Sequence, residues 1–246
     1  MSESFKTAVV TGASRGFGRA IAAALVAAGA DVIGVARDAQ QLQAVRSELG
    51  SNFEPVVADA VDETLAENII RDHQPGLLVL NAGIAPHLAP VHEQTWETFS
   101  RNWHVDTRHV FVWSRAALRA PLSWGSVVVA MSSGAVLAGS PLSGGYASAK
   151  AAIRYISTYA AEESQRGDLG IRFVSLLPQL TPTTRLGAAA VAGYAARQGI
   201  DQEAVVDGLQ PILTADQVAK AVVEIAADPD TAQAYRVSGA GLRQLS

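Results

Sequence analysis

The sequence predicts an α/β fold, a doubly wound and mostly parallel sheet of seven strands with helices on both faces. Short apolar runs alternate with longer helical patterns from one end of the chain to the other. Most of these runs are apolar at consecutive positions, which is typical of strands buried on both faces of a parallel sheet. The 246 residues contain no repeat, charge block or linker, so we expect one domain over residues 1–246.

The seven strands are expected over apolar runs at residues 8–10, 32–36, 55–58, 77–80, 126–131, 171–177 and 235–238. Several of the helices between them carry signals at their ends. Asp38 can cap a helix that runs to Leu49 and is followed by Gly50, and Asp62 can cap the next helix. Thr214 and Gln217 have the spacing of a capping box at the start of a later helix.

The composition excludes several classes of protein. Apolar residues make up 49 % of the chain and charged residues 17 %, which argues against disorder. The net charge of −4 predicts no nucleic-acid partner. Because the chain has no cysteine, disulfides, thiolate metal sites and a cysteine nucleophile are excluded. All five histidines fall between His73 and His109 without the spacing of metal ligands, so no metal is predicted.

One uncharged stretch raises the question of a membrane. Residues 120–149 carry no charged side chain, but two prolines and many serines and glycines would break a spanning helix. We expect a buried strand and a wall of the functional site there, in a protein without a membrane partner. The N-terminus shows no secretory signal, so the expected location is the cytoplasm.

Residues 184–213 stand apart from the alternating pattern. The central part, 187–211, is rich in alanine and glycine and interrupts the alternation between the sixth and seventh strands. An insertion at the carboxyl end of a strand is where an α/β sheet commonly builds a substrate lid. The segment is therefore either such a lid or an ordinary pair of surface helices.

The first strand runs directly into a glycine-rich turn, and an alanine-rich helix follows. Glycines at this place allow a tight turn and let a pyrophosphate approach the backbone and the positive end of the helix. The turn predicts a phosphate cradle made by Gly12, Ser14, Arg15, Gly16, Phe17 and Gly18. Its spacing, TGxxxGxG, resembles the compact single-domain branch of the short-chain dehydrogenase/reductase family. The resemblance implies a Rossmann-type sheet that binds a nicotinamide dinucleotide.

The end of the second strand indicates which dinucleotide is bound. NAD-dependent members generally place an acidic residue there, which bonds the ribose hydroxyls. This chain has Ala36 at that position and Arg37 after it, and a guanidinium suits a 2′-phosphate. Arg15 could approach the same phosphate. We therefore predict NADP(H), with NAD(H) as the less favoured cofactor.

The family's remaining cofactor positions follow in order. Asp59, with Ala60 beside it, resembles the residue that contacts the adenine. The triplet Asn81, Ala82 and Gly83 resembles the family's NAG motif, which steadies the sheet and lines the cofactor cleft. After the sixth strand, Pro178 and Thr183 match positions at the nicotinamide end, but Gln179 replaces the family's glycine and puts the local backbone geometry in doubt.

Tyr146 and Lys150 place a phenol and an ammonium one helical turn apart on the same face. A nearby cation favours the phenolate, so Tyr146 could give a proton to a carbonyl oxygen or take one from an alcohol. The resemblance implies that Lys150 also binds the nicotinamide ribose. Ser133 lies thirteen positions before Tyr146, the family's spacing, and its hydroxyl could donate to the substrate oxygen. Ser132 is the alternative to Ser133 for this role. A serine hydrolase is disfavoured, because neither serine lies in a Gly-x-Ser-x-Gly elbow.

The stretch from Val105 to Phe111 departs from the family pattern at two positions. Asp106 stands where the family has an asparagine that holds a water in a relay to the lysine, and His109 stands where it has glycine. Asp106 could keep the relay working with a shifted pH optimum, because its charge favours the protonated form of Lys150. It could equally be a bystander paired with Arg101 or Arg108.

The predicted function is hydride transfer between NADP(H) and a ketone or secondary alcohol, with Tyr146 as general acid and base. Leu137, Leu142 and Leu180, with the lid, predict an apolar pocket and a hydrophobic substrate. The helix from Tyr146 to Glu163 has an alanine- and serine-rich face that would let another helix approach. The resemblance implies a homodimer or homotetramer packed through this helix and the one ending near Leu118, and the alternative is a monomer with that face against its own core. The rival interpretation is a catalytically impaired, dinucleotide-binding sensor or interaction protein.

Overall fold

The computed structural model describes residues 6–245 and contains one eight-stranded sheet. Its strand order is β3-β2-β1-β4-β5-β6-β7-β8. The strands are β1 (Thr7–Thr11), β2 (Asp31–Ala36), β3 (Phe53–Val57), β4 (Leu77–Leu80), β5 (Val127–Met131), β6 (Arg172–Pro178), β7 (Ala234–Ser238) and β8 (Gly241–Gln244). The predicted doubly wound and mostly parallel sheet is confirmed.

The predicted number of seven strands is one too few. Strand β8 pairs antiparallel with β7 at the edge of the sheet, with Tyr235 opposite Gln244. It reads Gly-Leu-Arg-Gln and is largely exposed, so it has neither the apolar run nor the alternation that predicts a strand. Pairing with β7 makes it a strand.

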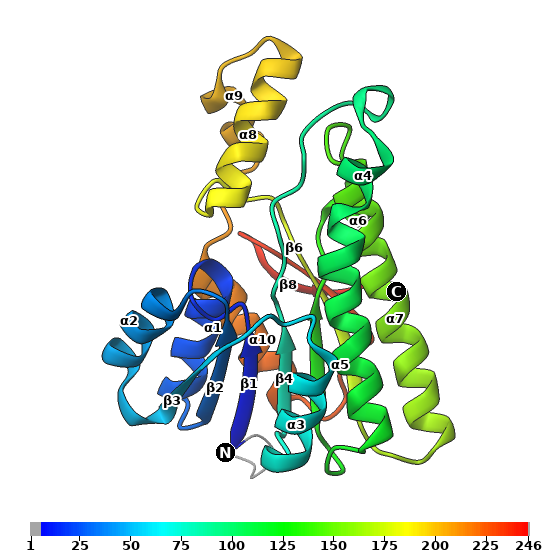
Figure 1. Cartoon of the computed structure of the whole chain (residues 1–246). Coiled ribbons are helices and arrows are strands. Elements are labelled where there is room, and N and C mark those ends of the chain that lie inside the picture. The colour runs from blue at the N-terminus through cyan, green and yellow to red at the C-terminus, as the bar shows by residue number, and fades with distance from the viewer. Residues whose placement is uncertain (1–5, 246) are drawn as a thin grey trace.

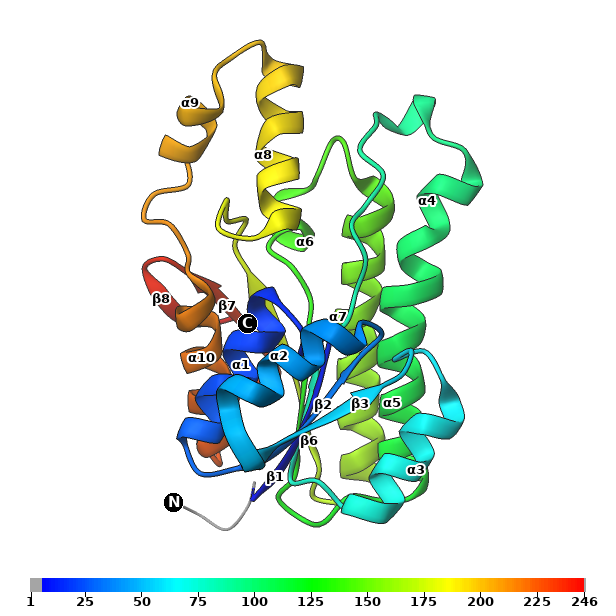
Figure 2. The same ribbon diagram turned by 60° about the vertical axis from the view of Figure 1, so that its left-hand side comes forward.

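Two layers of helices cover the sheet (Figures 1 and 2). One face carries α1 (Gly16–Ala27), α2 (Ala39–Leu49) and α10 (Ala215–Ala227), and the other carries α3 (Glu63–His73), α5 (Arg108–Arg119) and α7 (Gly144–Arg166). Successive strand residues belong to different cores: Val10 packs with the first set of helices and Val9 with the second. This explains why the strands are apolar at consecutive positions.

The predicted helix caps are confirmed. The Asp38 carboxylate accepts a hydrogen bond from the backbone N–H of Gln41 at 2.9 Å, and Gly50 follows the end of α2. The Asp62 carboxylate accepts one from the N–H of Leu65 at 3.1 Å. Thr214 begins α10 with a complete capping box. Polar caps thus fix where these helices begin.

The carboxyl ends of the strands define the functional edge of the sheet. Successive strands are added in one direction from β1 to β3 and in the opposite direction from β4 onward, so the switch point lies between β1 and β4. Open α/β sheets bind ligands at such a switch point. Several elements stand beyond the same edge in Figure 1: α4 (Trp96–Asn102), α6 (Ala135–Ala138), α8 (Arg185–Gln198) and α9 (Gln202–Asp207). The π-helical turn η4 (Trp103–Thr107) joins α4 to α5. Residues 184–213 contain the two helices α8 and α9, an arrangement compatible with either sequence interpretation.

The stretch 120–149 contains β5, α6 and the start of α7. Within residues 6–245, no helix is both long enough and apolar enough to cross a lipid bilayer. The same residues hold no cluster of three histidine or acidic side chains arranged for a metal ion.

Candidate active site

The glycine-rich turn joins β1 to α1 with a backbone that requires glycine. Gly12 and Gly16 have positive φ angles of 68° and 54°. A Cβ atom on Gly18 would lie 2.1 Å from the carbonyl oxygen of Gly12, so the turn can be this tight only without one. The N-cap Arg15 makes no side-chain hydrogen bond to the helix, which leaves the first N–H groups of α1 uncapped. The turn therefore has the form of an anion cradle.

The triplet Asn81-Ala82-Gly83 is fastened to this turn by Thr11. The buried Thr11 hydroxyl donates to the carbonyl of Val79 and accepts from the N–H groups of Asn81 at 2.9 Å and Ala82 at 3.1 Å. The Asn81 amide donates back to the Thr11 carbonyl at 3.0 Å. The triplet and the glycine turn thus form one rigid floor across the switch point between β1 and β4.

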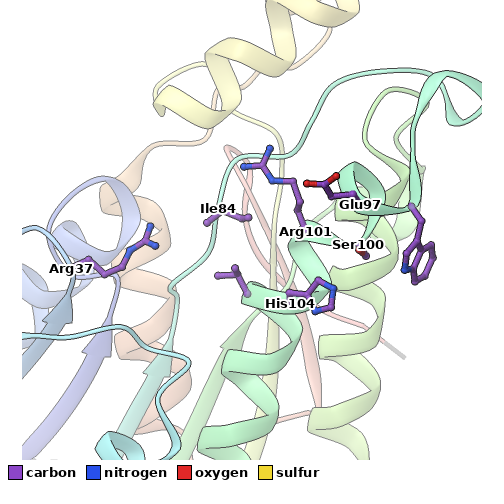
Figure 3. A pocket seen from close by; sticks show the side chains of 8 residues that line it. Arg37, Ile84, Glu97, Ser100, Arg101 and His104 are labelled. Atoms are coloured by element: carbon purple, nitrogen blue, oxygen red, sulfur yellow. The ribbon is translucent and has the colours of Figure 1, made fainter.

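A cleft of about 580 Å³ lies beside this floor (Figure 3). Arg37, at the end of β2, lines one side, and Arg101 and His104 line the other, with Ile84 between them. The Arg37 side chain is 68 % exposed, and its guanidinium lies 3.9 Å from the Asp59 carboxylate. The sequence did not predict Arg101 and His104 as cleft residues, because neither belongs to a motif and only the fold brings them opposite Arg37.

Ala60 and Phe17 serve the packing of the same region. The carbonyl of Ala60 accepts a hydrogen bond from the indole N–H of the fully buried Trp113 at 2.9 Å. Phe17 packs against the core formed by α1, α2 and α10. Ser14 is half-buried in the turn, next to the exposed Arg15.

Tyr146 and Lys150 lie one turn apart on α7, with the Lys150 ammonium 5.6 Å from the centre of the Tyr146 ring. Lys150 is 5 % exposed and donates a hydrogen bond to the Met131 carbonyl at the end of β5, at 3.1 Å. Its second partner is Asp106, whose carboxylate lies 3.3 Å from the ammonium. The helix spacing thus brings the phenol and the cation together.

Asp106 is fully buried where η4, α7 and the residues after Gly83 meet. Its carboxylate accepts hydrogen bonds from the N–H of Ile84 at 3.0 Å and from the Asn102 amide at 3.3 Å. A Cβ on Gly83 would lie 3.0 Å from the same carboxylate. Of the two interpretations of Asp106, the geometry favours contact with Lys150 over pairing with an exposed arginine.

The charge of Asp106 decides the protonation state of Lys150. Burial by itself lowers the pKa of Lys150, but the nearby Asp106 carboxylate, the Tyr146 phenol and the hydrogen bond to Asp106 together raise it above its ordinary value of 10.5. Lys150 is therefore an ammonium at neutral pH, and a buried carboxylate balances its charge.

The two serines after β5 have different partners. The Ser132 hydroxyl is buried and donates to the backbone carbonyl of Lys150 at 2.8 Å, so its proton is already engaged. The Ser133 oxygen accepts from the N–H of Ala135 at 3.2 Å, which leaves its own O–H free to donate. The geometry favours Ser133 over Ser132 as a donor to a substrate.

The loop after β6 is well anchored despite the replacement of glycine by Gln179. The Gln179 N–H continues the sheet by donating to the Val237 carbonyl at 2.8 Å, and its side chain donates to the Leu209 carbonyl at 2.9 Å. The Thr183 hydroxyl lies 3.0 Å from that of Thr181. The N–H of Gly134 donates to the Pro178 carbonyl at 2.8 Å, which ties this loop to the serine loop.

Comparison with known proteins identifies the family. The family profile described as short chain dehydrogenase matches residues 6–193. The chain belongs to this family. Over 98 residues it is 44 % identical to a probable NADP-dependent dehydrogenase of Haemophilus influenzae, which covers 37 % of the chain and only 39 % of that relative. Over 241 residues it is 32 % identical to serine 3-dehydrogenase of Agrobacterium fabrum, covering 91 % of the chain and 88 % of the relative.

Solved structures agree on the fold. Levodione reductase superimposes with a TM-score of 0.82 at 22 % identity, covering 95 % of this chain and 96 % of that one. The 3-ketoacyl-(acyl-carrier-protein) reductase of Brucella melitensis, complexed with NADH, gives 0.78 at 23 % identity with the same coverage of both chains. The short-chain dehydrogenases are oxidoreductases, so the chain is a member of an oxidoreductase family.

Replacing Asp106 with asparagine tests the ion pair. In the wild type, the raised pKa of Lys150 makes the pair stabilise the fold fully below pH 10.5, and this stability is lost only as the pH rises through the folded-state pKa. In Asp106→Asn, burial, opposed only by the Tyr146 phenol, lowers the pKa of Lys150, so the variant is destabilised by about 3 kcal/mol near neutral pH and recovers as the pH rises toward 10.5.

Urea unfolding at about pH 7 and about pH 9 measures this difference. The control Asp207→Asn removes a carboxylate from an exposed position and should change stability by less than about 0.5 kcal/mol at either pH. An equal loss for Asp106→Asn at both pH values would show that the charge on Lys150 is not its cause.

Proposed function

We propose that the chain is an NADP(H)-dependent oxidoreductase that interconverts a ketone and a secondary alcohol. The observation that carries the proposal is the arrangement of Tyr146 beside an ammonium held by Asp106 and the Met131 carbonyl. Ser132 ties the serine loop to the same helix, so Ser133 comes from an element fixed relative to Tyr146. The family and the names of its relatives support an oxidoreductase of this kind.

In the direction of reduction, the Tyr146 hydroxyl gives its proton to the carbonyl oxygen of the ketone. The Ser133 hydroxyl donates a hydrogen bond to the same oxygen and stabilises the negative charge that gathers there. Lys150 stabilises the phenolate left on Tyr146, which regains a proton from solvent. When bound, the nicotinamide supplies the hydride to the carbonyl carbon. One hydride and one proton thus convert ketone to alcohol, and the reverse reaction returns both.

The residues of the glycine turn fit a dinucleotide. The open backbone at Gly16 has no atom within 4 Å of the place where a Cβ would stand, and the uncapped start of α1 suits a pyrophosphate. We propose that the cofactor is held by Gly12, Ser14, Arg15, Gly16, Phe17, Gly18, Arg37, Asp59, Ala60, Asn81, Ala82, Gly83, Tyr146, Lys150, Pro178 and Thr183. Arg37 and Arg15, both exposed, favour the additional phosphate of NADP(H) over NAD(H).

We propose that residues 184–213 form the substrate lid of the single domain. The side chains of Leu88 and Leu142 approach α8 closely at Gly193, where a Cβ atom would lie 3.2 Å from Leu88 and 3.5 Å from Leu142. The Tyr194 hydroxyl also bonds that of Ser140 in the loop before α7. With Leu137 exposed on α6, these contacts support a mainly apolar pocket and a hydrophobic substrate. Protection of α8 amides from hydrogen exchange on substrate addition would support the lid.

A second candidate is a dinucleotide-binding sensor with little turnover. The Asp106–Lys150 ion pair favours it, because the carboxylate offsets the positive charge that would stabilise a Tyr146 phenolate. Tight binding of NADPH without oxidation of it by any ketone would support the sensor. The free Ser133 hydroxyl and the intact Tyr146–Lys150 spacing favour the enzyme.

Tyr146→Phe tests the proposed chemistry. Removal of the hydroxyl takes away the proton donor but keeps the ring, so we expect kcat to fall about a hundredfold or more, a far larger change than that in the dissociation constant of NADPH. NADPH oxidation is followed with levodione and a 3-oxoacyl thioester, and NADP⁺ reduction with serine. The control Tyr155→Phe alters an exposed tyrosine of the same helix and should leave kcat unchanged. Full activity of Tyr146→Phe would refute the assigned role.

Arg37→Ala tests the cofactor preference. Loss of a charge-assisted bond to the 2′-phosphate should raise the dissociation constant of NADPH about tenfold and leave that of NADH within about threefold. Arg71→Ala, which removes an exposed arginine from the far end of α3, is the control for a general loss of positive charge. Equal weakening of both cofactors by Arg37→Ala would contradict the assignment to NADP(H).

We also propose that the chain forms a homodimer or homotetramer through α5 and α7. Several small residues of α7, Ala149, Ser157 and Ala160, are buried within the chain itself. The outer face instead exposes Tyr155 and Tyr159, stacked with ring centres 6.2 Å apart, together with Phe111 of α5. A partner would cover these rings. Size-exclusion chromatography with light scattering should find an oligomer that Tyr159→Glu dissociates; a monomeric wild type would rule it out.

A further inference from the structure

The imidazole of His109 is buried next to the candidate active site without a protein partner. His109 lies in the first turn of α5, one turn after Asp106, and its side chain is completely buried. Among the described residues, neither ring nitrogen has a hydrogen-bond partner. A phenylalanine would fill this space without leaving buried nitrogens unsatisfied, so packing alone does not account for a histidine here.

The surroundings of His109 fix its charge. Burial lowers the pKa of His109, and the positive charge of Lys150 lowers it further. The nearby Ala82 backbone raises it only in part, and the resulting pKa is about 3. The ring is therefore neutral, with one nitrogen that donates and one that accepts. Its polar neighbours match these two capacities, since the Ala82 carbonyl can accept and the Lys150 ammonium can donate. The rings of His109 and Trp113 lie nearly perpendicular, at 74°, with ring centres 6.4 Å apart, so that side is apolar.

Lys150 has a hydrogen-bonding capacity that its protein partners do not fill. Its ammonium carries three N–H groups, of which Met131 and Asp106 take two. Asp106 binds this ammonium directly, so it does not hold the lysine through a water as the family's asparagine is expected to. Position 109, a glycine in the family pattern, carries in this chain a side chain that can hold water.

We propose that His109 is a positioning residue for Lys150, in which a buried water links the accepting ring nitrogen to the ammonium while the other nitrogen donates toward the Ala82 carbonyl. The imidazole then restrains the ammonium from a third side and joins it to the floor formed by Asn81-Ala82-Gly83. Buried waters of this kind serve polar groups that lack protein partners. The inference rests on the proposed function, because its consequence is the position of the Lys150 ammonium relative to the Tyr146 phenol.

Two substitutions separate this role from packing. His109→Phe keeps a ring of similar size but removes both nitrogens, and His109→Gln keeps one donor and one acceptor. We expect His109→Phe to lower kcat about tenfold, with KM and the dissociation constant of NADPH within about twofold, because Lys150 is misplaced rather than the cofactor lost. His109→Gln should retain kcat within about threefold of the wild type. Wild-type kcat in His109→Phe, or a larger loss in His109→Gln, would overturn the proposal.

A measurement independent of turnover keeps the two proposals separable. A high-resolution crystal structure of the wild type should show a water within about 3.2 Å of an imidazole nitrogen of His109. An imidazole with no water beside it would overturn the role of His109 even in an active enzyme. If no compound of the panel is turned over but the water is present, the oxidoreductase assignment fails and the water site stands. Thermal unfolding of each variant identifies any loss of the fold.

Discussion

The buried ion pair between Lys150 and Asp106 is the constraint on which the candidate site depends. It joins α7 to η4, and through Met131 and Ile84 it also fixes the ends of β5 and of the segment after β4. Buried ion pairs are weak sources of stability, because the loss of hydration offsets most of their attraction. Removing only one partner of such a pair is destabilising, since it leaves the other charge buried and unpaired. The pair therefore contributes position rather than stability, because it links the elements that carry its partners.

The Asp106 partner of this pair comes from the π-helical turn η4. Asp106 lies in a π-helical turn between α4 and α5, and such turns often mark functional sites because they redirect one side chain without ending the helix. Here the turn places Asp106 and Asn102 toward Lys150 and Ile84, while Arg101 and Arg108 stay exposed.

What the sequence predicted was local, and what it missed depends on contacts between distant elements. The glycine turn, the caps of α2, α3 and α10 and the buried strands all follow from neighbouring residues, and each was predicted. The partner of Asp106 was left open, because Lys150 and the two arginines are equally compatible with its charge. Strand β8 has no apolar pattern of its own, and Arg101 meets the cleft only through the placement of α4.

Asp106 is a carboxylate where the family pattern has the neutral amide of asparagine. This difference changes how Lys150 can act on Tyr146, from the electric field of its charge to the position of its N–H groups. A lone ammonium would act on Tyr146 mainly through its charge, whereas one paired with Asp106 presents a smaller net field. Its effect on the phenol then depends on the distance and direction of individual N–H groups, since a hydrogen bond keeps its strength where a net field is cancelled. The position and orientation of a paired ammonium must therefore be fixed more closely than those of an unpaired one. The fixed partners of Lys150 on β5 and η4 are the physical answer to that demand.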